Sequence, residues 1–302
     1  TVVNAGHDAA VIRLKGSNRG LAVKTDCNAR FVYLNPRRGA QIAVAEAARN
    51  VCCVGAKPIA ITNCLNFGNP YDPGVFWQFK EAVVGIGEAC RILETPVAGG
   101  NVSFYNESPG SAIYPTPVIG MLGLLQDYEE RIGSSFRSAG DAIMLLGANK
   151  SEIGGSEYLT WRIGDARGDA PELDLEIERK LQLVLLNLIH RGLINSAHDI
   201  SEGGIAVAVA ESLLSSPDGL GVEVSGNLGP NNRLDLNIFS ESQSMVLVSA
   251  HDENRQAVMR IVRGAGLSVE HLGFVNEGGK IAIAGRISVT REAARISYEE
   301  SI

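Results

Sequence analysis

Two glycines followed by an amide and a hydroxyl make up the stretch best suited to bind a ligand. In Gly99-Gly100-Asn101-Val102-Ser103 they come after an apolar segment, so a ligand could approach the backbone closely. Asn101 and Ser103 are two positions apart and face the same way if the strand continues. An amide oxygen suits a divalent cation, and a hydroxyl suits a phosphate or polar substrate. The stretch is not a P-loop, because it lacks a Gly-Lys-Ser/Thr ending.

Two further polar stretches follow predicted strands. Lys24 and Asp26 lie two apart at a strand end and could hold a phosphate and a metal together, or form a solvated turn. The segment from Asn63 to Pro73 is rich in Asn, Gly and Pro, and we expect a loop. Its Asn side chains either form turns or supply neutral ligands to a nucleotide or metal, and chemistry alone does not separate these alternatives.

A third polar stretch, His198-Asp199-Ile200-Ser201-Glu202-Gly203-Gly204, precedes a predicted helix. Such a helix N-terminus can receive an anion, or its amides can simply be capped by Ser201 or Asp199. His198 beside Asp199 has the composition of a catalytic dyad, but no nucleophile of a recognised pattern accompanies it. A structural histidine is therefore the favoured interpretation.

The elements that must position these residues alternate between strand and helix. Short strands, helices with apolar residues at helical spacing and a charged, polar stretch at 127–137 indicate two mixed α/β domains. We expect an N-terminal domain at 1–130, a C-terminal domain at 131–288 and a polar tail at 289–302 that is frayed or awaits a partner. The expected strands are 8–14, 20–25, 57–62, 117–125, 142–147, 221–224, 244–250, 268–275 and 280–284; the helices are 39–53, 75–93, 172–192, 205–214 and 252–264; the segment 195–204 is expected to be a loop.

Composition excludes several classes of protein. The 302 residues include 27 basic and 34 acidic ones, and a net charge of −7 argues against binding of nucleic acid. We find no apolar run long enough for a transmembrane helix. The five cysteines form no CxxC pair, so we expect reduced thiols in a cytoplasmic protein. The sequence opens at Thr1 without an initiator Met, and we expect a processed chain or a piece of a longer one.

Several motifs in this order resemble one family. They are Arg37-Arg38-Gly39-Ala40-Gln41, Val54-Gly55-Ala56-Lys57-Pro58, Asn63-Cys64-Leu65-Asn66-Phe67-Gly68, Gly99–Phe104, Asp199–Gly204 and Phe239-Ser240-Glu241-Ser242. The chain resembles the synthetase subunit of phosphoribosylformylglycinamidine synthase, and only its C-terminal half. That subunit has two similar halves, each pairing an aminoimidazole-ribonucleotide-synthetase-like mixed sheet domain with an α/β sandwich domain. The resemblance therefore implies an α/β (α+β) fold of that kind.

The resemblance also implies an activity. The family is an ATP-dependent ligase that uses magnesium and converts formylglycinamide ribonucleotide plus ammonia from glutamine into formylglycinamidine ribonucleotide in de novo purine biosynthesis. Its partners would be the missing N-terminal half, a glutaminase subunit and a small accessory subunit. The first half of the family carries its catalytic histidines in a Glu-Ser-His-Asn-His motif. The matching stretch Lys24–Ala29 lacks them, so we expect no catalytic residue here and no activity from this half alone.

Individual residues carry over by motif. Asn63, where the family often has Asp, and Gly100 correspond to ATP contacts, Asn101 to a magnesium ligand and Ser103 to a substrate contact. By pseudo-symmetry a second, auxiliary nucleotide site would be lined by Lys24, Asp26, Arg49, Asn50, Asp199 and Glu202.

Two alternatives remain. One is another ATP-dependent enzyme of the same superfamily, of the aminoimidazole ribonucleotide synthetase, selenophosphate synthetase or thiamine monophosphate kinase type. The other is a non-catalytic nucleotide-binding module, which the missing histidines would support. Because one half would lack its sibling, we also expect exposed apolar strand surface and self-association.

Overall fold

The computed structural model describes residues 1–3, 6–108 and 110–300. The N-terminal domain is built on a five-stranded sheet in the order β1-β2-β7-β3-β4, in which only β3 and β4 run parallel to each other. A loop beyond the outer strand carries a small separate hairpin, β5–β6. The strands are β1 (Ala10–Arg13), β2 (Gly20–Asp26), β3 (Lys57–Asn66), β4 (Val97–Ser103), β5 (Glu107–Ser108), β6 (Ser111–Ala112) and β7 (Thr116–Leu125).

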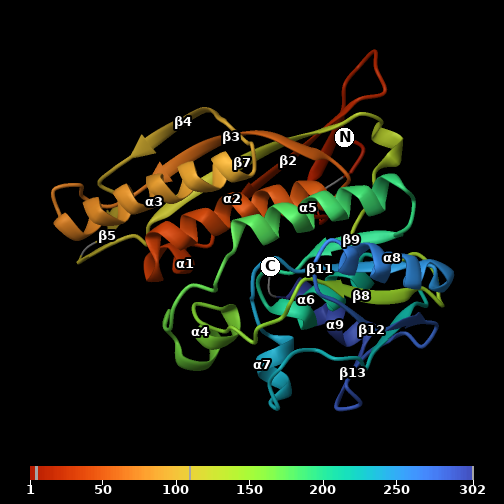
Figure 1. Ribbon diagram of the computed structural model, residues 1–302. Helices are drawn as coiled ribbons and strands as arrows, with labels where there is room; N and C mark the ends of the chain where they lie inside the picture. Colours follow the sequence, from red (N-terminus) through yellow and green to blue (C-terminus); the bar gives the residue numbers. More distant parts are fainter. Residues whose placement is uncertain (4–5, 109, 301–302) are drawn as a thin grey trace.

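Three helices cover one face of this sheet and leave the other face without a helix (Figure 1). They are α1 (Ala29–Leu34), α2 (Pro36–Cys53) and α3 (Pro73–Ile92). Both long helices have Pro in the first turn, and Asn35 and Asp72 cap them by accepting hydrogen bonds from backbone amides. The alanines of α2 allow it to lie close against the sheet, where it buries the alternate residues Ile119 and Met121 of β7.

The C-terminal domain is a seven-stranded sheet with helices on both faces, in the order β14-β13-β10-β12-β8-β11-β9. Alternate residues of its central strands feed two cores: Met144 and Leu146 of β8 pack toward α5 and α8, and Ile143 and Leu145 pack toward α6. The strands are β8 (Ala142–Leu146), β9 (Ser196–Asp199), β10 (Gly221–Val224), β11 (Val246–Ala250), β12 (Val269–Asn276), β13 (Lys280–Ile283) and β14 (Ile287–Thr290). The helices are η1 (Tyr128–Glu130), in the connection between the domains, α4 (Glu157–Ile163), α5 (Leu175–His190), α6 (Gly204–Leu214), α7 (Leu234–Ile238), α8 (Asp252–Gly264) and α9 (Arg291–Glu299).

Helix α2 joins the two domains. The face of α2 that is turned to the N-terminal sheet belongs to the N-terminal core. Cys52 and Cys53 at its end pack into the core formed with α5. Polar residues of α2 are equally enclosed, because Arg49 and Asn50 are buried where α2 meets β9. The interface between the domains is therefore partly apolar and partly ionic.

The predicted two-domain α/β fold is confirmed, with three local corrections. The expected loop at 63–73 begins later, because β3 continues to Asn66 by pairing with β4 and β7. The expected loop at 195–204 contains β9, whose polar residues are satisfied by partners across the domain interface. The tail expected to be frayed instead begins within β14 and continues as α9, because β14 pairs with β13 and α9 packs on α6; residues 301–302 lie outside the described residues.

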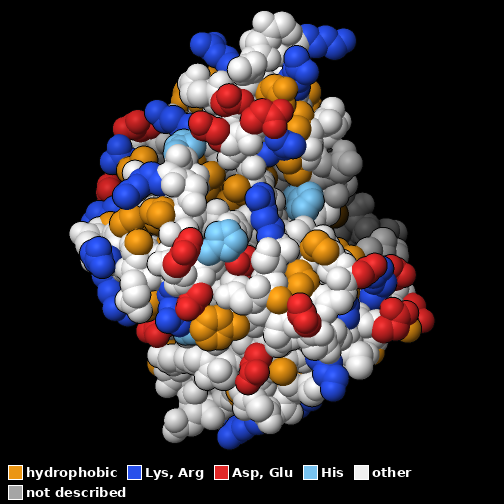
Figure 2. Space-filling view, turned by 90° about the vertical axis from the view of Figure 1, so that its right-hand side faces the viewer, with side chains coloured by type: hydrophobic (Ala, Val, Ile, Leu, Met, Phe, Trp, Pro, Cys, Tyr) orange, Lys and Arg blue, Asp and Glu red, His pale blue; other side chains and the backbone are white. Residues whose placement is uncertain are grey.

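Two expectations about chemistry and location can be compared with the structure. All five cysteines are free thiols, although Cys27 and Cys64 are only partly buried. Among the helices of the described residues, none combines the length and the apolar character needed to cross a membrane. Figure 2 shows acidic and basic side chains intermixed over the face in view.

Candidate functional site

The first group of predicted site residues lies on neighbouring strands at the outer edge of the N-terminal sheet. The register pairs Asn63 of β3 with Gly100 of β4, and Asn66 with Ser103. A Cβ added at Gly100 would overlap Asn63 Oδ1 and would lie 2.7 Å from the Asn63 carbonyl oxygen. Glycine is therefore required at position 100 for the Asn63 side chain to lie against the backbone of β4.

The four predicted residues divide between the two faces of the sheet. Asn63 and Gly100 are in one row with Ile119, which is buried against the helices. Asn101 and Ser103 belong to the alternate rows and project from the face that no helix covers. Because β4 continues through Ser103, these two side chains share a face, as predicted. The structure brings all four to one edge but does not aim them at a single point.

The polar groups of this edge are neutral. Asn101 is exposed, and the partly buried Ser103 is held by Asn106, whose Nδ2 donates to the Ser103 hydroxyl at 3.2 Å and to its carbonyl oxygen at 2.9 Å. The Asn101 amide oxygen is a suitable ligand for Mg²⁺. Within the described ranges, no three His, Cys, Asp or Glu side chains group so as to hold a metal. Asn101 therefore fits as one ligand of an ion whose other ligands come from elsewhere.

The second group of predicted residues surrounds the interface between the domains. Arg49 is fully buried and donates through Nη1 to Glu178 at 2.9 Å, and its Nε donates to Asp199. Asn50 Nδ2 donates to Asp199 Oδ2 at 3.0 Å. Lys24 and Asp26 interact electrostatically with Asp199 and with each other, and Glu202 interacts with Asp26. All six residues predicted to line an auxiliary site, namely Lys24, Asp26, Arg49, Asn50, Asp199 and Glu202, thus belong to one charged cluster.

Burial shifts the acid–base behaviour of this cluster. Burial, together with the carboxylates of Glu202 and Asp199, raises the pKa of Asp26 to about 7 despite the nearby Lys24. Burial also raises the pKa of Glu46 well above its ordinary value, and Asp26 and Asp199 add to this effect. Although burial opposes the charge of Lys24, Asp26 and Asp199 raise its pKa. The cluster therefore holds a cationic lysine beside a carboxyl group that can gain or lose a proton near neutral pH.

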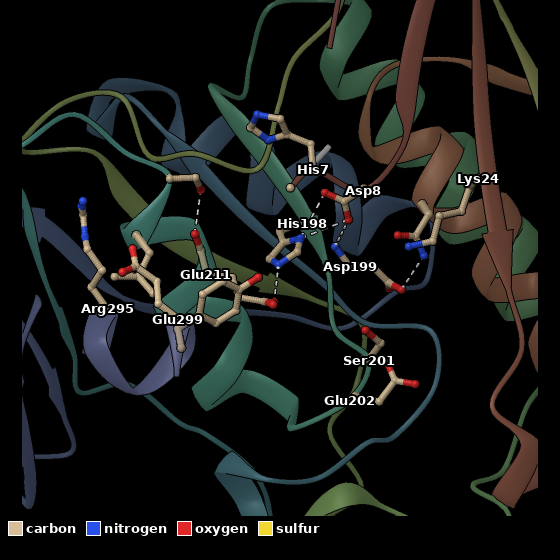
Figure 3. Close-up of a pocket in the computed structure, with 15 residues that line it drawn as sticks. His7, Asp8, Lys24, His198, Asp199, Ser201, Glu202, Glu211, Arg295 and Glu299 are labelled. Atoms are coloured by element: carbon tan, nitrogen blue, oxygen red, sulfur yellow. Dashed lines mark hydrogen bonds and ion pairs between the residues drawn. The ribbon is translucent and has the colours of Figure 1, made fainter. Parts of the chain in front are cut away.

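A cavity of about 490 Å³ adjoins the cluster (Figure 3). His198 lies in its wall between two carboxylates: Nδ1 is 3.0 Å from Asp8 Oδ2, and Nε2 is 3.1 Å from Glu211 Oε2. Burial opposes protonation of His198, but Asp8 and Glu211 outweigh it and raise its pKa to about 10. His198 is thus an imidazolium that ties the N-terminal segment to α6, as expected of a structural histidine. Nothing in the sequence spacing identified Asp8 or Glu211 as its partners.

The loop that precedes α6 is fixed by a buried carboxylate, that of Glu241. Glu241 Oε1 accepts hydrogen bonds from the amides of Gly203, at the start of α6, and Glu157, at the start of α4, at 2.8 and 2.9 Å. Burial raises the pKa of Glu241 to about 7. The expected cap from Ser201 or Asp199 is wrong, because the N-cap residue of α6, Gly203, has no side-chain capping hydrogen bond.

The fold and the two groups of residues define a class of protein. The family model described as "AIR synthase related protein, N-terminal domain" matches residues 6–125, and the model described as "AIR synthase related protein, C-terminal domain" matches residues 138–286. Together they cover most of the chain, which therefore belongs to the AIR synthase related proteins.

Within this class the chain is homologous to the phosphoribosylformylglycinamidine synthase subunit PurL, which confirms the resemblance seen in the sequence. It is 52% identical over 273 residues to PurL of Moorella thermoacetica, covering 90% of this chain and 37% of that protein. It is 49% identical over 295 residues to PurL of Chlorobaculum tepidum, covering 95% and 39%. The chain thus spans well under half the length of these relatives.

Solved structures of more distant relatives share the fold. The structure of Thermotoga maritima PurL complexed with FGAR superposes with a TM-score of 0.78 at 22% identity, covering 95% of this chain and 47% of that one. The structure of the same protein complexed with ATP gives a TM-score of 0.74 at 20% identity, covering 95% and 46%.

Proposed function

We propose that this chain is one half of a phosphoribosylformylglycinamidine synthase synthetase and contributes binding contacts to a shared active site. The observation that carries the proposal is the outer edge of the N-terminal sheet. There, binding groups are displayed on an open face, with Asn101 and Ser103 among the neutral neighbours Thr62, Cys64 and Asn66. Such an edge can position a ligand, but it offers no strong acid or base to transform one.

The reaction proposed for the complete protein proceeds in two steps. The terminal phosphoryl group of ATP passes to the glycinamide carbonyl oxygen of formylglycinamide ribonucleotide, and ADP leaves. Ammonia then attacks the carbon that carries this oxygen, and the bond from that carbon to the phosphorylated oxygen breaks, so that phosphate departs and the amidine remains. Magnesium, when bound, neutralises charge on the phosphates. Positioning by fixed neutral groups is the part of this catalysis that the edge can perform.

Each residue of the edge has a proposed task. The backbone at Gly100, kept open by the absence of a Cβ, would meet ATP together with the Asn63 amide. The Asn101 amide oxygen would be one ligand of magnesium. The hydroxyl of Ser103, oriented by Asn106, would touch the ribonucleotide.

The acid–base chemistry is assigned to the missing half. The stretch Lys24–Ala29 contains no histidine, and Lys24 and Asp26 belong to the charged cluster between the domains. Burial raises the pKa of the Cys27 thiol far above its ordinary value, so this thiol is a poor nucleophile at neutral pH. The chain alone should bind without catalysing.

For the charged cluster we propose the auxiliary nucleotide site. The cavity beside it is lined by Lys24, Asn50, Asp199 and Glu202, while Arg49 and Asp26 lie behind these residues. A nucleotide held there would strengthen the contact between the domains rather than react.

The proposed partners are the N-terminal half of the synthetase, a glutaminase subunit and a small accessory subunit, and the proposed location is the cytoplasm. A solved structure of PurLQS from Thermotoga maritima, which shares the fold, supports this set of partners.

The proposal is tested by complementation. Release of phosphate from ATP is measured with formylglycinamide ribonucleotide and ammonium chloride, using the chain alone, the separately produced N-terminal half of Moorella thermoacetica PurL, and both together. Activity should require both polypeptides. The variant Asn101→Ala should complement poorly even at saturating partner concentration. Robust turnover by the chain alone, or no turnover by the mixture although the two polypeptides associate, would contradict the proposal.

A further inference from the structure

A second polar side chain lies beside Ser103 on the open face of the N-terminal sheet. Asn66 ends β3 and is the register partner of Ser103 on β4, the strand at the edge of the sheet (Figure 1). The two side chains therefore project from the same face, one strand spacing of about 4.8 Å apart. Both are half-buried, so a ligand that reaches Ser103 from the open face also meets Asn66.

Two backbone carbonyl oxygens fix the orientation of the Asn66 amide group. Asn66 Nδ2 donates to the carbonyl oxygen of Cys64 and to that of Thr116, its register partner on β7, both at 3.1 Å. The side-chain NH₂ group of asparagine has two hydrogens, and both are thus used. The reverse orientation would place Oδ1 against two carbonyl oxygens, which repel it. The nitrogen end of the amide is therefore held against the strands.

The oxygen end of the same amide group is left for a ligand. Among the described residues, Asn66 Oδ1 meets only the Cys64 thiol, at 3.7 Å, and a thiol is a weak donor. The Thr116 hydroxyl does not compete for Oδ1, because it donates to the carbonyl oxygen of Tyr114 at 2.7 Å. An amide oxygen has two lone pairs. The open face thus presents a fixed hydrogen-bond acceptor at Asn66.

Ser103 is fixed by a comparable arrangement. Asn106 Nδ2 lies 2.9 Å from the carbonyl oxygen of Ser103 and 3.0 Å from that of Phe67. Both ends of the Asn106 amide group also contact the Ser103 hydroxyl, Nδ2 at 3.2 Å and Oδ1 at 3.3 Å. Asn106 reaches back to Ser103 because the chain turns at Tyr105, whose φ of 61° is in the left-handed region. Asn66 and Ser103 are therefore both ordered before a ligand binds, which lowers the entropic cost of binding.

We propose that Asn66 is a second contact to the ribonucleotide substrate, and that its Oδ1 accepts a hydrogen bond from a neutral donor of that substrate, a hydroxyl or an amide N–H. The neighbouring side chains Asn101 and Ser103 are neutral as well. A phosphate group does not fit at Asn66, because phosphate oxygens are acceptors and Oδ1 has no hydrogen to give. The inference rests on the proposed function, in which Ser103 touches the ribonucleotide, and adds to it a residue and the kind of group that this residue selects.

The test measures steady-state kinetics of the whole chain complemented by the N-terminal half of Moorella thermoacetica PurL, with ATP, magnesium and ammonium chloride. Asn66→Ala should raise the KM for formylglycinamide ribonucleotide about tenfold, the order of effect of one lost hydrogen bond. The kcat, the KM for ATP and the magnesium concentration for half-maximal rate should each change less than about twofold. A merely structural loss would instead lower the active fraction, and hence kcat, without raising this KM.

Two further variants separate binding from folding. Asn66→Ser keeps a polar group on the strand but lacks the projecting amide oxygen, and it should show the same rise in KM. The matched control is Asn149→Ala. Asn149 Nδ2 likewise donates to two backbone carbonyl oxygens, those of Leu228 and Asn237, both at 2.7 Å. This variant removes the same kind of support in the C-terminal domain and should leave the KM for the ribonucleotide unaltered.

A fragment of the substrate identifies the donor. D-Ribose 5-phosphate keeps sugar hydroxyls and lacks the amide chain, and its inhibition constant is measured with the unaltered chain and with Asn66→Ala. A rise in parallel with the KM would assign the contact to a sugar hydroxyl. An unaltered inhibition constant beside a raised KM would assign it to the amide N–H.

The outcomes separate the inference from the function on which it rests. If the unaltered mixture shows no turnover, the proposed function is wrong, and the inference falls with it. If the mixture turns over and Asn66→Ala leaves the KM for the ribonucleotide unaltered, or raises the magnesium requirement in its place, the substrate contact of Asn66 is overturned while the shared site stands.

Discussion

At the scale of single residues, the outer sheet edge depends on a steric detail that distinguishes two adjacent glycines. A Cβ at Gly100 would overlap the Asn63 side chain, whereas a Cβ at Gly99 would meet no atom within 4 Å. Gly100→Ala should therefore lower the free energy of unfolding by about 1–3 kcal/mol, the usual cost of overpacking. Gly99→Ala is the matched control and should change it by less than about 0.5 kcal/mol. Urea unfolding followed by circular dichroism measures both, and equal effects would contradict the assigned contact.

The partly buried carboxyl of Asp26 leads to a prediction about pH. Its pKa in the folded protein is about 7, above the ordinary value of 3.8. Between these values the folded state holds a proton that the unfolded state releases, so its contribution to stability falls as the pH rises through this interval. Asp26→Asn, which cannot ionise, should be more stable than the unaltered chain at pH 8 by at least about 1 kcal/mol.

The difference in stability between Asp26→Asn and the unaltered chain should shrink toward pH 4, where Asp26 is protonated in the folded protein and is therefore neutral like asparagine. Urea unfolding at pH 4, 6 and 8 measures it, with Glu253→Gln as a control that removes an exposed carboxylate. A difference independent of pH would show that burial of Asp26 does not govern its ionisation.

At the scale of elements, the sequence predicted the elements of the two cores and missed those stabilised by distant polar partners. The central strands and long helices carry apolar residues at strand or helix spacing, as in β7 and α5, and this pattern is local. By contrast, β9 contains His198 and Asp199, whose partners Asp8 and Arg49 lie 190 and 150 residues away in sequence. Such pairings are absent from any local window, so this segment resembles a loop.

The candidate site shows the same division. The alternation of Asn101 and Ser103 in a strand is a local property, and it could be predicted. The row that joins Asn63 to Gly100 depends on strand register, which spacing within one strand does not determine. The six auxiliary residues were grouped by resemblance to a family, and the cavity beside them, with its wall of α9 residues, was not foreseen.

Helix α9 has a polar sequence that suggested a frayed tail, and the contacts of Arg291 explain why it is ordered instead. Its Arg291 side chain donates to carbonyl groups at the end of α6 and just beyond it, and lysine cannot reproduce this planar set of donors. Arg291→Lys should increase amide hydrogen exchange across residues 292–299 at least about tenfold and leave α5 unchanged. Mass spectrometry of deuterated fragments measures this, with Arg286→Ala as a control. Unaltered exchange in α9 would show that packing on α6 suffices to hold it.

At the scale of the whole molecule, the open face of the N-terminal sheet is the largest departure from a self-sufficient fold. Ile12 and Val23 are 46% and 38% exposed, and the register places Leu21, Leu122 and Leu124 on the same face. A sheet that buries one face under helices and leaves apolar residues on the other usually has a partner there. In the proposed function that partner is the sibling half of the synthetase, whose fold would present an equivalent face.

An isolated chain should therefore pair with itself through this face. Light scattering across a range of concentrations should show the mass rising toward that of two chains, since a symmetric dimer would bury the same residues on both copies. Val23→Lys places a charge at the centre of the patch and should keep the chain monomeric. Ile163→Lys changes an exposed apolar residue on α4, outside the patch, and should dimerise like the unaltered chain. A strict monomer at every concentration would mean that the open face is not a pairing surface, and the half-site proposal would then require another way to bring the sibling half to β4.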